Sequence, residues 1–133
     1  RDFKPSAQLQ QPYTMAGFNI FAADTQEEAE LIATSAMQTV VALRTGTPGR
    51  LQPPLPGYRD TLPPMAQSML ANFFAASSIG TQEQVERDLA AFIRRTRVDE
   101  VIVSGFIYDA DARKRSAEIG MAAMKAIEAE VTA

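Results

Sequence analysis

The sequence predicts an α/β protein in which parallel strands alternate with helices, and three observations carry this prediction. Two apolar segments, Tyr13–Ala23 and Val101–Ile107, have the composition of buried strands. The residues between them show the apolar spacing of helices, and a connection of this kind joins parallel strands. An amphipathic helical pattern also follows each apolar segment directly. We therefore expect two adjacent parallel strands and about four helices, at 25–44, 64–76, 82–96 and 110–130.

The first unit begins with Tyr13–Ala23, whose nearly continuous apolar run is typical of a strand covered on both faces. Gly17 and Asn19 interrupt the run. The commoner interpretation is a small residue that accommodates a packed neighbour, and the alternative is a position that points into a barrel or toward a ligand. Thr25 and Glu28 then have the spacing of a capping box, which predicts the start of the helix over 25–44.

A Pro/Gly-rich loop is predicted over residues 45–64, "TGTPGRLQPPLPGYRDTLPP", which holds three glycines and six of the eight prolines. Proline removes an amide donor and fixes φ, so this stretch forms neither a helix nor a central strand. Long loops inside compact domains are usually binding lids or linkers. Composition alone favours a surface loop or linker somewhat over a lid.

Two helices and the second unit complete the chain. The segment 64–76 has a stripe of Met and Phe at helical spacing, which is typical of core packing. Thr81, with Gln84 in the box position, predicts the start of the helix over 82–96. The β-branched residues of Val101–Ile107 predict the last strand. Asp109 is placed to cap the final helix.

Composition excludes several functional classes. The chain has 133 residues, a formal charge of −3 and a pI near 4.9, so it lacks the basic footprint of a nucleic-acid-binding protein. Its apolar runs fall short of the roughly 20 residues that a membrane helix needs. The absence of cysteine fits a reducing compartment, and we expect a cytoplasmic protein. Cysteine and histidine are both absent, which excludes thiolate chemistry and any histidine-based triad or zinc site within this chain.

Two strands cannot form a stable sheet alone, because both faces and both edges would remain open. The sequence also begins at Arg1 and reads as if entered in mid-course, so we expect a segment of a larger α/β structure. The alternative is a non-catalytic α/β module that completes its sheet by self-association.

The segments "KPSAQLQQPYTMAGFNIFAADTQEEAELIATS" and "IGTQEQVERDLAAFIRRTRVDEVIVSGFIYDADARKRSAEI" resemble the bacterial luciferase-like flavin-dependent monooxygenases. The first is similar to the seventh strand and following helix of that family's barrel, and the second to its last crossover helix, eighth strand and final helix. The resemblance covers nearly the whole chain. It implies that residues 1–133 are one segment, the seventh and eighth β/α units at the C-terminal end of a (β/α)8 TIM barrel.

The resemblance also implies a function for the intact parent protein. Members of this family bind reduced FMN and use it with oxygen to oxidise a small organic substrate. A sister group on the same barrel binds a deazaflavin and transfers hydride as a dehydrogenase or reductase, and this is the alternative function. The family's active-site lid corresponds in position to the loop 45–64, which favours the lid interpretation. The phosphate contacts and the active-site histidine of the family lie in earlier strands. We therefore expect no catalytic residue and no metal here, and an inactive fragment whose partners are the remaining barrel strands or a second copy. The residues expected near the substrate pocket or lid are Ala22, Asp24, Arg50, Tyr58, Phe106 and Tyr108.

Overall fold

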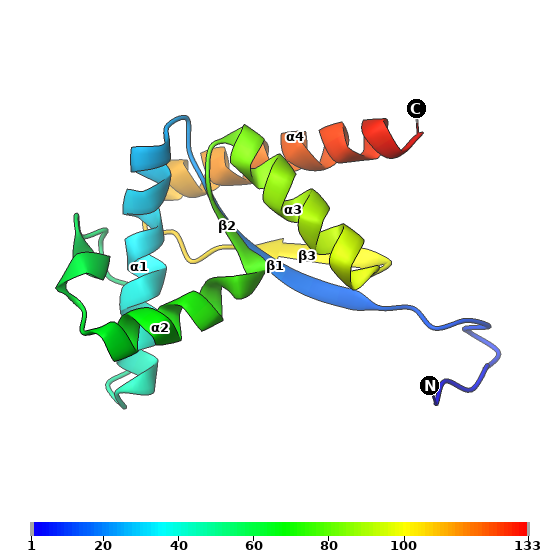
Figure 1. The fold of residues 1–133 in the computed structure, drawn as a ribbon, viewed down its shortest axis with the longest axis horizontal. Coiled ribbons are helices and arrows are strands. Elements are labelled where there is room, and N and C mark those ends of the chain that lie inside the picture. The colour runs from blue at the N-terminus through cyan, green and yellow to red at the C-terminus, as the bar shows by residue number, and fades with distance from the viewer. Residues whose placement is uncertain (1, 133) are drawn as a thin grey trace.

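The computed structural model describes residues 2–132, with side chains through residue 130, as three strands, four α-helices and two short 3-10 helices (Figure 1). In chain order the elements are β1 (Met15–Ala22), α1 (Gln26–Arg44), η1 (Tyr58–Thr61), α2 (Pro64–Phe73), η2 (Phe74–Ala76), β2 (Ser77–Gly80), α3 (Gln82–Thr96), β3 (Glu100–Ser104) and α4 (Ala110–Thr132). The α/β class and the four predicted helices are confirmed. The predicted helix over 64–76 becomes 3-10 in its last turn, at η2.

The strands form one parallel sheet in the order β2-β1-β3. The predicted pairing of the first and last strands is confirmed, because Met15–Asn19 of β1 pair with Glu100–Ser104 of β3. The expected number of strands was wrong, since β2 is a third strand, which pairs with β1 from Asn19 to Ala22. β2 has four residues, three of them serine or glycine, and such a segment carries almost no intrinsic strand signal.

The two neighbours of β1 occupy its opposite edges. The carbonyl of Thr14 accepts hydrogen bonds from Asp99 and Glu100 beside β3, whereas the amide of Ala23 donates to Gly80 at the end of β2. Within the described residues, β2 covers only the carboxyl-terminal half of its edge of β1, and the outer edge of β3 pairs with no strand. The outer edge of β2 is likewise unpaired among the described residues, so the sheet has three open stretches of strand edge.

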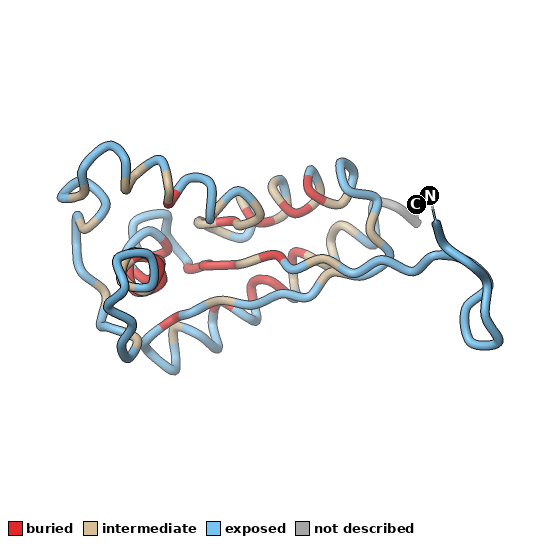
Figure 2. The backbone as a smooth tube through the Cα atoms, turned by 90° about the horizontal axis from the view of Figure 1, so that it is seen from below, coloured by how far each residue is buried: buried red, intermediate tan, exposed pale blue. Residues whose placement is uncertain are grey.

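The two faces of the sheet are covered unequally. Phe18, Ile20 and Ala22 of β1 pack under α3 and α4 in one core cluster. On the opposite face, Phe21 packs with α1 and Leu70 of α2 in a second cluster at the carboxyl end of the strands. Figure 2 shows the buried positions along β1 and on the helix surfaces turned toward it. The amino-terminal half of this second face is open, and Met15 and Ile102 on it are 52% and 51% exposed.

The end of β3 differs from the prediction. The strand stops at Ser104 and not at Ile107, and residues 105–109 form an irregular connection to α4. At Gly105 a Cβ atom would lie 2.5 Å from the carbonyl oxygen of Ile20, so the chain passes against β1 too closely for any side chain. This approach ends the regular pairing and turns the chain toward α4.

The predicted helix starts are mostly confirmed. The hydroxyl of Thr25 accepts a hydrogen bond from the amide of Glu28, and Asp109 accepts from the amides of residues 111 and 112. Thr81 holds the N-cap position of α3, but its side chain makes no capping hydrogen bond.

No helix in the described part of the chain is both long and apolar enough to cross a bilayer.

Candidate functional site: the carboxyl ends of the strands

A cleft of about 250 Å³ opens at the carboxyl end of β1, between α1 and α4. Its walls include Ala22 and Asp24 after the strand, Leu31 and Ile32 of α1, and Ala112 and Arg115 of α4. Ligands of open parallel α/β sheets bind at this end of the strands, where successive connections diverge. The predicted residues Ala22 and Asp24 therefore lie together in one cleft.

Asp24 and Arg115 form an ion pair at this cleft. Nε of Arg115 lies 3.1 Å from Oδ1 of Asp24, and the guanidinium also lies 3.3 Å from Glu118. Hydrogen bonding from Arg115 lowers the pKa of Asp24, and the same bond raises the pKa of Arg115. Both side chains are exposed, so the pair is screened by solvent and its main effect is to orient α4 against the end of β1.

Ala22 is almost fully buried, and its backbone supports the wall of the cleft. Its amide donates to the hydroxyl of Ser116 at 2.9 Å, and that hydroxyl lies 3.4 Å from the carbonyl of Ile20. β3 has already left this edge of β1, so Ser116 of α4 binds the polar backbone groups that a neighbouring strand would otherwise bind. This contact fixes the wall of the cleft.

Tyr58 and Arg50 lie elsewhere. Tyr58, in η1, lines a larger cavity of about 800 Å³ between the Pro/Gly-rich loop and α1, together with Gln26 and Glu30. Partial burial there raises the pKa of Tyr58. Arg50 is exposed and lines neither cavity. The structure does not bring these two residues to the cleft of Ala22 and Asp24.

Phe106 and Tyr108 lie on the connection after β3. Both are about half exposed, at 53% and 50%, while Ile107 between them is buried against α1 in the core. Exposed and buried side chains therefore alternate along residues 106–108, as they would in a strand, although this segment is not a strand. Their role as walls of a pocket stays a prediction.

A row of polar side chains crosses the open face of the sheet close to this end. Asn19 of β1 is in register with Ser104 of β3 and with Ser77 of β2. The Ser104 hydroxyl donates to Oδ1 of Asn19 at 2.9 Å, and Nδ2 of Asn19 lies 3.5 Å from the Ser77 hydroxyl. We call Asn19, Ser77 and Ser104 the polar row.

Sequence reasoning missed Arg115 as a site residue. Helical spacing places Ser116 on the buried face of α4, but no local pattern identifies the backbone groups of β1, more than 90 residues away, as its partners. The ion pair of Arg115 with Asp24 spans a similar separation and carries no local signal either.

The parallel β/α units, with α3 and α4 on one face and a cleft at the carboxyl end, define a part of an α/β barrel. No family model matches the sequence. The chain is 38% identical over 120 residues to a protein of Escherichia coli K-12 called "Luciferase-like monooxygenase", a match that covers 90% of this chain and 36% of that protein. It is 36% identical over 117 residues to "Uncharacterized protein YvbT" of Bacillus subtilis, covering 88% of this chain and 35% of YvbT.

Among solved structures, the crystal structure of apo-MsnO8 matches 92% of this chain and 38% of its own with a TM-score of 0.77, at 21% sequence identity. The residues are therefore a homologous segment of the luciferase-like monooxygenase family, and the resemblance inferred from the sequence is confirmed. The chain spans about 36% of the length of the curated relatives.

Proposed function

We propose that this chain is the C-terminal segment of a flavin-dependent monooxygenase, in which reduced FMN and oxygen oxidise a small organic substrate. The observation that carries the proposal is the 38% identity over 120 residues to a luciferase-like monooxygenase of Escherichia coli. The open strand edges support it, because each is placed where a neighbouring barrel strand would pair.

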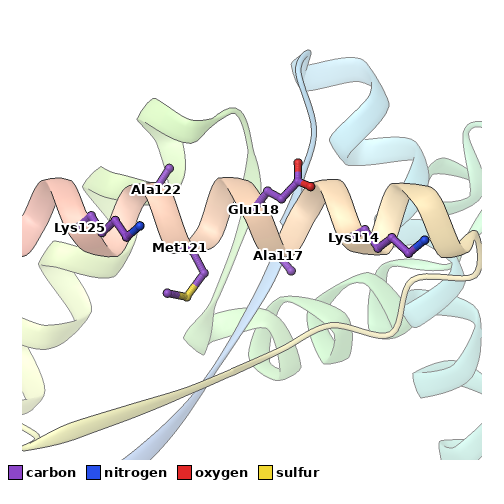
Figure 3. Close-up of a pocket in the computed structure, with 6 residues that line it drawn as sticks. All are labelled: Lys114, Ala117, Glu118, Met121, Ala122 and Lys125. Atoms are coloured by element: carbon purple, nitrogen blue, oxygen red, sulfur yellow. The ribbon is translucent and has the colours of Figure 1, made fainter.

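The remaining barrel strands are the partner that this proposal requires. The outer edge of β3 is open, and Val103 beside it is 41% exposed. A groove of about 590 Å³ also runs along the outer surface of α4 (Figure 3). Ala117 and Met121 project from the same side of α4 there, between Lys114 and Lys125. An additional β/α unit would cover this apolar strip with its helix and pair with β3 through its strand.

In the assembled protein, meaning this chain together with the strands that complete its sheet, the flavin supplies the electrons that activate oxygen. The residues described here contribute walls and orientation. The open face of the sheet ends in the polar row, which suits a polar heterocycle, and Phe106 and Tyr108 offer aromatic surface beyond it. The loop 45–64, proposed as the lid, would exclude water from the pocket.

Equilibrium titration with FMN and with a deazaflavin, followed by flavin fluorescence, tests this function. The assembled protein should bind FMN more tightly than the deazaflavin. The isolated 133-residue chain should bind both weakly or not at all, because one wall of a pocket cannot hold a ligand tightly. Submicromolar FMN affinity of the isolated chain, or preference of the assembled protein for the deazaflavin, would contradict the proposal.

A further inference from the structure

The cavity of about 800 Å³ that Tyr58 lines is enclosed by four parts of the fold. Residues 26–37 of α1 and 56–60 of the loop contribute most of its walls, and Gln67 of α2 and Ile79 of β2 complete them. Sites for small molecules in proteins have volumes of roughly 300–1,000 Å³. The cavity therefore has the size of a ligand site.

Hydrogen bonds between the elements fix the walls of this cavity. The amide of Leu55 donates to the hydroxyl of Thr34 at 2.9 Å and attaches the loop to the middle of α1. The side chain of Gln26 donates to the carbonyl of Ile79 at 3.3 Å and joins the start of α1 to β2. A ligand that enters a space with fixed walls pays little for ordering them, which favours binding.

Part of the cavity wall is apolar. Leu31 and Met37 of α1 line it with Ile79, and Met37 is only 7% exposed. Tyr58 adds an aromatic ring, and within the described residues its hydroxyl has no hydrogen-bond partner. These side chains suit a ligand with an apolar or aromatic body.

The charged groups of the wall are mostly acidic. The carboxylates of Glu27, Glu30 and Asp60 line the cavity, and the guanidinium of Arg59 is the single basic group among the lining residues. Within the described residues the carboxylates of Glu27 and Asp60 have no hydrogen-bond or ion-pair partner, whereas Glu30 accepts a hydrogen bond from Gln26. Charge complementarity therefore favours a cationic ligand over an anionic one.

We propose that this cavity binds a small organic amine. Its apolar body contacts Leu31, Met37 and the ring of Tyr58. Its ammonium group, which has only hydrogen-bond donors, lies at the carboxylates of Glu27 and Asp60, which have only acceptors. The inference goes beyond the proposed function, because it requires no flavin. The carboxylates are exposed, so each should strengthen binding only roughly 2- to 5-fold at low salt.

The test uses the assembled protein and three probes of similar shape, namely 2-phenylethylammonium, the neutral 2-phenylethanol and the anion phenylacetate. In titrations at low salt the ammonium should bind most tightly and phenylacetate least. Glu27→Gln and Asp60→Asn should each weaken binding of the ammonium roughly 2- to 5-fold and leave that of the alcohol unchanged. The matched control is Glu83→Gln, which removes an exposed carboxylate of α3 that pairs with Arg87, outside the cavity. It should change neither affinity.

Equal affinity for the ammonium and the alcohol would overturn the inference, as would equal effects of Glu27→Gln and Glu83→Gln. Amine binding without FMN binding would contradict the proposed function and leave this inference standing.

Methionine methyl resonances locate the bound amine without any substitution. In the assembled protein with ¹³C-labelled methionine methyl groups, saturating 2-phenylethylammonium should move the resonance of Met37, which lines the cavity. The resonance of Met65, which is 85% exposed on α2 and lines no part of this cavity, should stay in place. An unmoved Met37 resonance would overturn the inference.

Discussion

Asp24, two residues after β1, and Arg115, in the second turn of α4, form an ion pair across 91 residues of sequence. The pair connects the ends of the two β/α units at the cleft that also contains Ala22. It therefore ties the geometry of the candidate site to the packing of α4.

This ion pair makes a pH-dependent contribution to stability. Hydrogen bonding to Arg115 lowers the pKa of Asp24 below its ordinary value of 3.8 in the folded state. A lowered folded-state pKa stabilises the fold above the unfolded pKa, and this contribution is lost as the pH falls through the folded pKa. Asp24→Asn should therefore lower the melting temperature of the assembled protein slightly at pH 7, and the difference should vanish in strong acid. Because the pair is exposed, its effect should also shrink at high salt. A difference that stays constant below pH 3 would contradict this account.

The hydroxyl of Ser116 is a buried link between α4 and β1. Ser116→Ala leaves the amide of Ala22 without its partner, which should cost about 1–3 kcal/mol of unfolding free energy. Ser68→Ala on α2 is the control, since it removes an exposed hydroxyl that bonds only within its helix and should change stability by less than about 0.5 kcal/mol. Denaturant unfolding of both variants of the assembled protein gives the comparison. Equal stability of the two would mean that water replaces Ser116.

The close approach at Gly105 predicts intolerance of any side chain. In Gly105→Ala the new methyl group would lie 2.5 Å from the backbone oxygen of Ile20, so the chain after β3 must shift. Overpacking of this kind typically costs about 1–3 kcal/mol. Gly49→Ala, in open space on the loop, should be nearly neutral. Thermal melts of the assembled protein that rank the two variants in the reverse order would show that the Gly105 connection relaxes freely.

The loop 45–64 is attached to α1 along only part of its length. The amide of Leu55 donates to the hydroxyl of Thr34, and the side chain of Gln38 donates to the carbonyl of Pro53, each at 2.9 Å. Segment 45–52 has no corresponding contact to the middle of α1. We therefore predict that only the first half of the loop moves while residues 53–62 stay docked.

Limited trypsin digestion of the assembled protein tests this division of the loop. Cleavage after Arg50 should be fast, whereas cleavage after Arg59, in η1, should be slow. Thr34→Val removes the acceptor for Leu55 and should accelerate cleavage after Arg59 with little effect at Arg50. The control Thr39→Val removes a hydroxyl that bonds only to the backbone of Ser35. Equal acceleration by both variants would mean that Thr34 does not anchor the loop.

Elements formed by contacts between residues close in sequence were predicted well, and elements formed by contacts between distant residues were not. α1 and α4 carry local signals, namely apolar spacing and the caps Thr25 and Asp109, and both were predicted nearly to the residue. β2 has no such signal, because Ser77–Gly80 becomes a strand only through pairing with β1. At the site, strand ends predicted Ala22 and Asp24. Their partners Ser116 and Arg115 are contributed by packing between distant segments, which periodicity does not report.

The central claim is that this chain is one sector of a barrel whose remaining strands cover its open edges and face. Burying one large apolar side chain contributes about 1.5–3 kcal/mol, and Met15, Ile102, Val103 and Met121 are all substantially exposed. Leaving several such groups in water forfeits much of the roughly 5–15 kcal/mol that stabilises a domain. Sedimentation equilibrium of the purified 133-residue chain, combined with a thermal melt, tests the claim most directly. We predict no folded monomer, but either an unfolded chain or an assembly through its strands. A compact monomer that melts cooperatively at micromolar concentration would contradict the claim.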